Sequence, residues 1–228
     1  MRIHYIQHVP FEEPGYIEQW LTNHLHTITS TRIWEDSRFP SPDSFDLLII
    51  MGGPMGVYDD HMYAWLTDEK NFIHAAVQND KKIIGICLGA QLLACVLGAT
   101  IFTNKHKEIG WFPVSFDPSL SGWLDQPVAE TMTVFHWHGD KFDIPYGGLI
   151  HAASEGCNHQ VFTYGDHIIG LQFHAEATPA TVRAMLQHCG HELQEAPFIQ
   201  ATEVIEAYNS FEDPNGLMGA ILRKMCTE

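Results

Sequence analysis

The most constraining feature of this sequence is the segment KKIIGICLGAQLLA at residues 81–94. Its β-branched first half predicts a short buried strand, and its Ala- and Leu-rich second half predicts a helix. Cys87 lies between them, flanked by Gly85 and Gly89. Such small neighbours allow a sharp, strained strand-to-helix turn that presents one side chain at a helix N-terminus. The segment therefore predicts either a reactive thiol or a buried structural cysteine in a glycine-containing turn.

Short apolar strands alternate with helical segments in the first half of the chain. We expect strands at residues 2–9, 29–34, 45–50 and 82–86, and helices at residues 16–26, 63–79 and 90–97. This alternation predicts parallel strands with helices on both faces. The expected fold class is therefore α/β, with an open, mostly parallel, flavodoxin-like sheet.

After Gly98 the pattern changes to a small β-rich excursion. Strands are predicted at residues 100–115, 131–135, 149–154, 159–164 and 167–173, with turns at Pro118 and Gly122. Thr178 followed by Pro179 predicts the start of a further helix. Two more helices are expected at residues 199–208 and 217–225, divided by the turn-forming residues 213–216. Because no linker or repeat interrupts the chain, we expect one domain at residues 1–195 with a helical extension at 196–228.

Charge and cysteine content exclude several classes of protein. The formal net charge of −16, with no basic run, argues against a nucleic-acid partner. The five cysteines form no paired spacing, which excludes a disulfide framework or a zinc ribbon. A start on a strand pattern, without the apolar core of a signal peptide, predicts a cytoplasmic protein. The uncharged run at residues 83–102 is long enough to cross a membrane. Its three glycines and its change of period favour a buried strand and helix instead.

A nucleophilic thiol needs a base, and the base needs an orienting group. His174 and Glu176 follow the apolar strand predicted at residues 167–173, and Cys87 likewise follows a strand. In an open parallel sheet the carboxyl ends of the strands share one edge, so these side chains can reach one crevice. A single histidine there could be structural. Together with Glu176 and the Cys87 turn, however, it predicts a Cys-His-Glu catalytic set.

Acyl transfer also needs hydrogen-bond donors for the oxyanion that develops in the reaction. The backbone N–H of Leu88 directly follows the nucleophile at the turn. Gly52-Gly53-Pro54 follows another predicted strand, and its glycines allow close approach of the backbone. Leu88 is therefore one expected oxyanion donor, and the Gly52-Gly53-Pro54 segment is the expected source of a second.

The segments at residues 85–91, 52–54 and 170–176 together resemble the class I glutamine amidotransferase family, in particular stand-alone proteins similar to the glutaminase domain of GMP synthase. The resemblance spans about residues 1–190. It implies that Cys87 attacks the side-chain amide of glutamine, forms a γ-glutamyl thioester and releases ammonia. His174 would transfer protons, and Glu176 would orient it. The resemblance also implies that Gly53 and Leu88 form the oxyanion hole through their backbone N–H groups, and that Gln91 and Gly52 contact the substrate. The family requires no cofactor.

The segment His136-Trp137-His138-Gly139-Asp140 resembles the Ser-His-Gly-Asp segment that lines the family's substrate pocket, with Trp137 in place of serine. The resemblance thus adds His138 and Asp140 as substrate-binding residues. Ala175 and Ala90 also depart from the family pattern, but neither removes a catalytic group. His136 and His138, with an aspartate nearby, could instead ligate a metal. Since no third strand supplies a ligand cluster in the sequence, we expect no metal site.

Several functions remain open from the sequence. The chain could release ammonia from glutamine for a separate synthetase subunit, because only two short helices follow residue 195. It could act alone as a hydrolase or transferase of small γ-glutamyl compounds. A binding protein that has kept the fold without turnover, and a peptidase-like cysteine enzyme, are further alternatives. The complete set of Cys87, His174 and Glu176 favours an enzyme with a glutamine or γ-glutamyl substrate, without nucleic acid or membrane.

Overall fold

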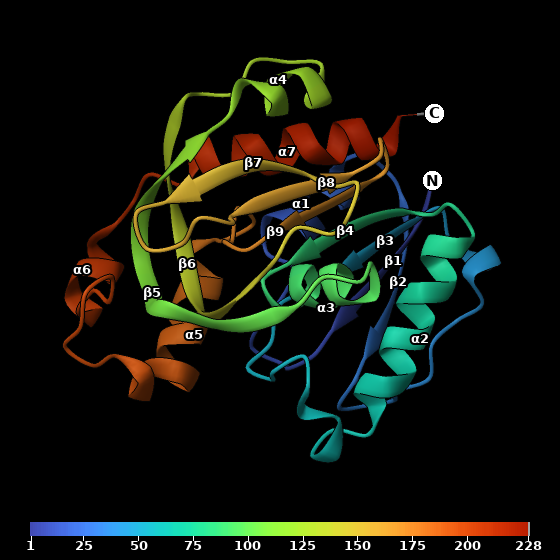
Figure 1. The fold of residues 1–228 in the computed structure, drawn as a ribbon, viewed down its shortest axis with the longest axis horizontal. Helices are drawn as coiled ribbons and strands as arrows, with labels where there is room; N and C mark the ends of the chain where they lie inside the picture. The colour runs from blue at the N-terminus through green and yellow to red at the C-terminus, as the bar shows by residue number, and fades with distance from the viewer. Residues whose placement is uncertain (228) are drawn as a thin grey trace.

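A single nine-stranded sheet runs through the molecule in the computed structural model, which describes residues 1–227 (Figure 1). The strand order is β2-β1-β3-β4-β9-β8-β7-β5-β6. The strands are β1 (Arg2–Gln7), β2 (Thr27–Arg32), β3 (Leu47–Ile50), β4 (Lys82–Ile86), β5 (Ile101–Phe116), β6 (Thr131–Phe142), β7 (Leu149–Ser154), β8 (Val161–Tyr164) and β9 (Ile168–Leu171). Strands β2, β1, β3, β4 and β9 pair in parallel, and the remaining pairings are antiparallel. The α/β fold is confirmed, and the predicted β-rich excursion extends the same sheet.

Helices cover both faces of the parallel half. They are α1 (Tyr16–Asn23), α2 (Trp65–Gln78), α3 (Leu88–Val96), α4 (Pro118–Leu124), α5 (Pro179–Cys189), α6 (Thr202–Ala207) and α7 (Glu212–Cys226), with three short 3₁₀ turns at Pro42–Ser44, Asp59–His61 and Gly190–Glu192. The side chains of β3 alternate between the faces, as strand geometry requires. Leu47 and Ile49 join the cluster under α1 and α7, whereas Leu48 and Ile50 join the cluster under α2 and α3. A strand buried on both faces accounts for its continuous apolar sequence.

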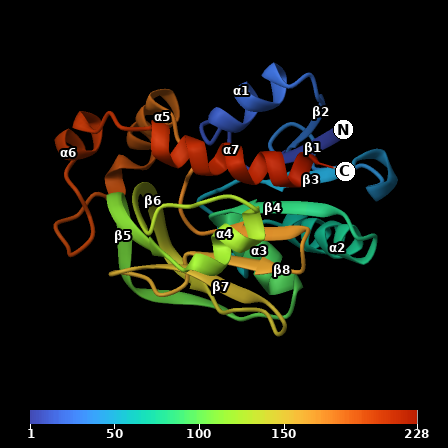
Figure 2. The ribbon, with the colours of Figure 1, turned by 90° about the horizontal axis from the view of Figure 1, so that it is seen from above.

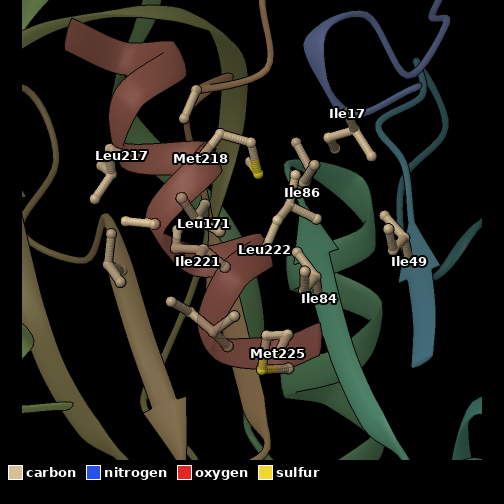
Figure 3. Close-up of a cluster of buried hydrophobic side chains, with 14 of the residues drawn as sticks. Ile17, Ile49, Ile84, Ile86, Leu171, Leu217, Met218, Ile221, Leu222 and Met225 are labelled. Carbon is tan, nitrogen blue, oxygen red and sulfur yellow. The ribbon is translucent and has the colours of Figure 1, made fainter. Parts of the chain in front are cut away.

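Helix α7 lies along one face of the sheet beside α1 (Figure 2). Its side chains Met218, Leu222 and Met225 lie toward Ile84 and Ile86 of β4 (Figure 3), and Leu217 and Ile221 belong to the same core cluster. The last helix of the chain is thus part of the main core. Among the described residues, no helix combines the length and the apolar character that crossing a bilayer requires.

Two predictions about turns were wrong. Residues Pro118–Leu124 form α4 rather than turns, because the Asp117 side chain accepts a hydrogen bond from the Ser119 backbone (2.9 Å) and proline occupies the first helical turn. Residues 213–216 lie inside α7 rather than before it. Pro214 is tolerated there since the first N–H groups of a helix have no intrahelical partner.

The strand predicted at residues 131–135 is longer in the structure: β6 continues through Phe142, so the segment at residues 136–140 is part of it. The remaining predicted elements differ only at their ends: α1 stops at Asn23, and β2 begins two residues early at Thr27. Element ends are the least determined part of a sequence pattern.

The turn after β4 depends on its glycines. A Cβ on Gly89 would overlap the Ile50 carbonyl oxygen, and one on Gly85 would lie 2.6 Å from the Gly89 carbonyl oxygen. Both obstacles are backbone, which cannot rotate away as a side chain would. Glycine at these positions therefore lets α3 approach β3 and β4 closely enough to form the sharp turn at Cys87.

We expect Gly89→Ala to destabilise the fold by at least about 3 kcal/mol, the upper range for overpacking, because the added methyl group meets backbone atoms. Gly216→Ala is the matched control: it is also a helical glycine, and none of the described atoms lies within 4 Å of the added Cβ. That control should stabilise the protein by up to about 1 kcal/mol through helix propensity. Urea unfolding measures both values. Equal, small effects for the two variants would contradict the close approach.

Candidate active site

Cys87 occupies a strained backbone conformation between β4 and α3. Its φ and ψ are 50° and −111°, a combination that a non-glycine residue adopts only when its surroundings enforce it. The Cys87 backbone N–H donates to the Leu171 carbonyl (2.8 Å), and its own carbonyl accepts from the Gln91 N–H (3.1 Å). These bonds fix the thiol at the N-terminus of α3.

Three neighbouring parallel strands deliver the predicted site residues to one edge of the sheet. Strands β3, β4 and β9 are adjacent, with Ile50 opposite Gly85 and Ile86 opposite Leu171. Gly52, Cys87 and His174 follow the carboxyl ends of these three strands. A Cβ on Gly52 would lie 3.1 Å from His174 Cε1 and 3.5 Å from Cys87 Cβ. The structure therefore brings these residues together, as their places after strands predicted.

His174 is buried and oriented by Glu176. Its Nδ1 lies 2.7 Å from Glu176 Oε1, and its backbone N–H donates to the Phe135 carbonyl (2.8 Å). Burial by itself would lower the pKa of His174. The charge of Glu176 and the interactions with Cys87 outweigh it and raise this pKa well above 6.5. The Glu176 carboxylate therefore favours the charged form of the His174 ring.

The loop after β9 is anchored by the C-terminal part of the chain. The Asn215 side-chain amide of α7 donates to the carbonyls of Ala175 and Ala177, both at 3.0 Å. These two residues flank Glu176. Helix α7 thus fixes the orienting carboxylate as well as covering the core.

The Gly52-Gly53 segment is held by a buried ion pair that the sequence analysis missed. His8 donates through Nδ1 to the Gly52 carbonyl (2.8 Å), and its Nε2 lies 2.9 Å from Glu69 Oε1, with both side chains fully buried. Burial tends to lower the pKa of His8, but Glu69 and the Gly52 carbonyl raise it above its ordinary value. The sequence did contain a signal: Glu69 is an acid on the apolar stripe of the helix predicted at residues 63–79.

Other residues that were predicted to bind the substrate lie at the same edge of the sheet. In the structure, however, they contact other groups of the protein. The Gln91 side-chain amide donates to the Asp140 carbonyl and to Gln172 Oε1, both at 3.2 Å. Asp140 thus contributes its backbone here. His138 borders the cleft, yet its Nε2 lies 3.1 Å from the buried Glu108 of β5. Gln172 and Glu108 are further residues that the sequence analysis did not single out.

A cleft of about 230 Å³ opens above Cys87. Its wall carries Lys107 and Glu192, which form an ion pair at 2.7 Å, and Glu12 from the loop after β1. Glu12 is 8% exposed, and a Cβ on Gly52 would lie within contact distance of its carboxylate. Burial raises the pKa of Glu12 to about 7, with smaller opposing effects from His174 and His8. The Glu12 carboxyl group of the cleft therefore changes between its neutral and its charged form near neutral pH.

The raised pKa of Glu12 predicts a pH-dependent cost to stability. Between its ordinary value of 4.5 and about 7, the unfolded chain releases this proton and the folded chain retains it. Folding stability therefore falls across that interval, by on the order of 3 kcal/mol. Glu12→Gln removes this cost, so its melting temperature relative to wild type should be higher at pH 8 than at pH 5. The exposed neighbour Glu13 provides the control, Glu13→Gln, which should show no such trend. The same trend in both variants would refute the assignment.

Comparison with known proteins places this geometry in a family. Residues 16–193 match the model of the family described as glutamine amidotransferase class-I. Glutamine amidotransferase-like protein YfeJ of Salmonella typhimurium is 33% identical, covering 92% of this chain and 91% of that protein. A glutamine amidotransferase from Thermotoga maritima has a similar crystal structure, with a TM-score of 0.88, 28% identity and coverage of 100% of this chain and 99% of that one.

This chain covers only part of the length of two further relatives. GMP synthase of Bacillus velezensis is 30% identical over 67% of this chain, which corresponds to 27% of that protein. Gamma-glutamyl peptidase 3 of Arabidopsis thaliana is 27% identical over 62% of this chain and 59% of its own length. The family match covers most of the chain and includes the elements that carry Cys87 and His174. The chain therefore belongs to the class I glutamine amidotransferase family.

Proposed function

We propose that this protein is a thiol amidohydrolase that cleaves the γ-amide of glutamine through a γ-glutamyl thioester on Cys87. The observation that carries the proposal is the arrangement of Cys87, His174 and Glu176. The nucleophile lies on a strained turn at a helix N-terminus, beside a buried histidine that a carboxylate orients at 2.7 Å. This arrangement has the three roles that nucleophilic catalysis requires, namely nucleophile, base and orienting group.

In the first half-reaction the Cys87 thiolate attacks the γ-carbonyl carbon, and the carbonyl oxygen becomes an oxyanion. The backbone N–H groups of Gly53 and Leu88 would stabilise that charge; their residues are neighbours, since a Cβ on Gly53 would lie 3.0 Å from Leu88 Cδ2. The charged His174 donates its proton to the departing nitrogen. The C–N bond breaks, and ammonia and the thioester are formed.

In the second half-reaction water replaces ammonia. His174, now neutral, accepts a proton from water as the oxygen attacks the thioester carbon. The C–S bond then breaks, glutamate leaves and the Cys87 thiolate is restored. Glu176 holds the His174 ring in one orientation throughout and stabilises its charged form. The balance is glutamine and water to glutamate and ammonia.

The charges of the cleft suit an α-amino acid head group. Lys107 offers a cation for an α-carboxylate, and Glu192 and Glu12 offer carboxylates for an α-ammonium group. All three are on the wall of the cleft that contains Cys87. The proposed ligand is therefore a zwitterionic glutamyl group whose γ-carbonyl reaches the thiol. A separate synthetase subunit that accepts the ammonia remains part of this proposal.

A stand-alone γ-glutamyl peptide hydrolase or transferase is the second candidate. The cleft wall beyond Cys87 includes the apolar side chains of Met55 and Met185, which could contact the side chain of a leaving amino acid. The similarity to a plant protein named as a γ-glutamyl peptidase supports the same idea. In that case the leaving group is an α-amine and the chemistry at Cys87 is unchanged.

Ammonia and amine release distinguish these functions. Wild-type protein should hydrolyse glutamine or γ-glutamyl dipeptides, and Cys87→Ala should lose at least about 10⁴-fold in rate, as expected for loss of a nucleophile. Intact mass spectrometry should detect the γ-glutamyl adduct on wild type alone. Cys95→Ala is the control and should keep full activity, because Cys95 lies outside the cleft lining. Equal inertness of wild type and Cys87→Ala, with no adduct, would contradict the proposal. Faster cleavage of dipeptides than of glutamine would favour the second candidate.

The His8 contact predicts a separate effect on the oxyanion site. Since a peptide unit is planar, a fixed Gly52 carbonyl also fixes the direction of the Gly53 N–H on the same unit. His8→Leu should therefore lower kcat by about 10²-fold to 10³-fold, the range for loss of one oxyanion donor, with little change in KM. His8→Gln, which keeps a donor, should recover part of that loss.

The control for this prediction is His4→Leu. His4 is a buried histidine of β1 that contacts Thr29 and Thr31 rather than the cleft, at 2.9 Å and 3.0 Å. Its loss should lower the melting temperature without a specific fall in kcat. A proportional fall of melting temperature and kcat in both variants would show that His8 has only a structural role.

A further inference from the structure

A second cluster of chemically active side chains lies on the antiparallel half of the sheet. Glu108 of β5 is directly opposite His138 of β6, and Gly110 is opposite His136. His136 and His138 are two residues apart on one strand, so their side chains share a face of the sheet. Glu108 projects from the neighbouring strand onto that same face, because directly opposite residues of an antiparallel pair do so. Three potential ligands thus converge from two strands.

The three side chains are fully buried and close together. His138 Nε2 lies 3.1 Å from Glu108 Oε2, and His136 Nδ1 lies 3.8 Å from the same oxygen. One ligand atom from each residue lies within 4.8 Å of the others. In a tetrahedral zinc site with bonds of ~2.0–2.1 Å, neighbouring ligand atoms are about 3.4 Å apart. The two nitrogen–oxygen distances in the cluster, 3.1 Å and 3.8 Å, lie on either side of that value.

Several of these buried atoms lack a hydrogen-bond partner. Within residues 1–227, neither ring nitrogen of His136 has one, and the contact of His138 Nε2 with Glu108 does not have hydrogen-bond geometry. Buried polar atoms are nearly always satisfied, and leaving one unpaired is unfavourable. Apolar packing alone does not explain why two histidine side chains are buried against one carboxylate.

The surrounding contacts are those that orient metal ligands. His138 Nδ1 lies 3.1 Å from the Asp140 carbonyl, which can only accept, so Nδ1 carries the proton. In the neutral ring Nε2 then presents a lone pair toward the Glu108 oxygen. The carboxylate in turn accepts hydrogen bonds from Ser154 Oγ (2.6 Å) and Gln160 Nε2 (2.8 Å). A backbone carbonyl behind the histidine and donors behind the carboxylate are typical of the residues that support a metal site.

We propose that Glu108, His136 and His138 bind a divalent transition-metal ion, with zinc as the ion that this donor set fits best. A cation between the carboxylate and the two imidazoles removes the repulsion between lone pairs and gives the unpartnered nitrogens a ligand role. Two histidines and one carboxylate are a common donor set for zinc. This proposal replaces our expectation from the sequence that no metal site is present, because the third ligand comes from a strand that the sequence pattern did not connect to His136 and His138.

The site would act as a structural clamp next to the cleft. The two histidines flank Trp137, whose carbonyl lies 3.6 Å from the Cys87 thiol. His138 also borders the cleft, which provides a route for the ion to a site that is otherwise buried. Fixing both neighbours of Trp137 would fix the wall of the cleft beside the nucleophile. The proposal does not depend on which substrate Cys87 attacks.

Metal binding is tested on the full chain carrying Cys87→Ala, which removes the cleft thiol as a competing ligand. Elemental analysis of tag-free protein should find about one zinc ion per chain. After removal of metal with a chelator, one equivalent of Co²⁺ should produce the visible absorption of a tetrahedral site, without the near-ultraviolet band of cobalt–thiolate bonds. Added zinc should abolish that absorption and raise the melting temperature by about 5–10 °C at a hundredfold excess over Kd.

Substitutions of the cluster residues test whether the metal ion binds at this cluster. His136→Gln and Glu108→Gln, each added to Cys87→Ala, should lose the cobalt spectrum and the thermal response to zinc. His151→Gln is the control, because His151 is another buried histidine of the sheet but is hydrogen-bonded to Ser119 and Thr163, both at 2.8 Å. It should keep the spectrum. Protein that contains no stoichiometric metal and shows no thermal response to zinc would overturn the proposal, and this result does not depend on the folding of the His136→Gln or Glu108→Gln variants. A cobalt spectrum that persists in His136→Gln, or that shows thiolate bands, would overturn it as well.

Discussion

The active-site edge depends on the contact between Gly89 and Ile50. Because residue 89 has no side chain, α3 approaches β3 closely enough for the chain to turn sharply at Cys87. The turn places the thiol in a conformation that cysteine does not adopt by preference, with φ at 50°. The surrounding hydrogen bonds to Leu171 and Gln91 maintain it. Backbone strain at this position is offset by packing in the rest of the sheet, and the outcome is a thiol whose direction is fixed by the fold.

Buried charged groups surround this fixed thiol in pairs. His174 with Glu176 and His8 with Glu69 each combine an imidazole with a carboxylate at 2.7–2.9 Å. In each pair burial disfavours the charged ring, and the carboxylate outweighs that effect. The first pair bears on the thiol, and the second bears on the peptide between Gly52 and Gly53. At Glu108 two imidazoles converge on one carboxylate, and neither ring nitrogen of His136 has a hydrogen-bond partner among the described residues; this convergence is the basis for inferring a cation there.

The C-terminal helices take part in this organisation. Helix α7 covers the face of β4 opposite α3, and through Asn215 it holds the loop that carries Glu176. Its length was underestimated from the sequence because Asp213-Pro214-Asn215-Gly216 has the composition of a turn. In the structure Pro214 lies in the first turn of the helix, the one place where its missing N–H has no consequence.

The sequence by itself determined the alternation of strands and helices, the Cys87 turn and the family, because each element and each motif consists of residues close together in the chain. The position of Gly52, Cys87 and His174 after strands was also sufficient to predict a shared edge, since parallel strands align their carboxyl ends. Only the tertiary structure decided which groups those residues meet. Glu12, His8, Glu69 and Glu108 come from elements that the sequence pattern did not associate with the cleft. Their burial and their contacts depend on strand order and on cross-strand register, which no local pattern specifies.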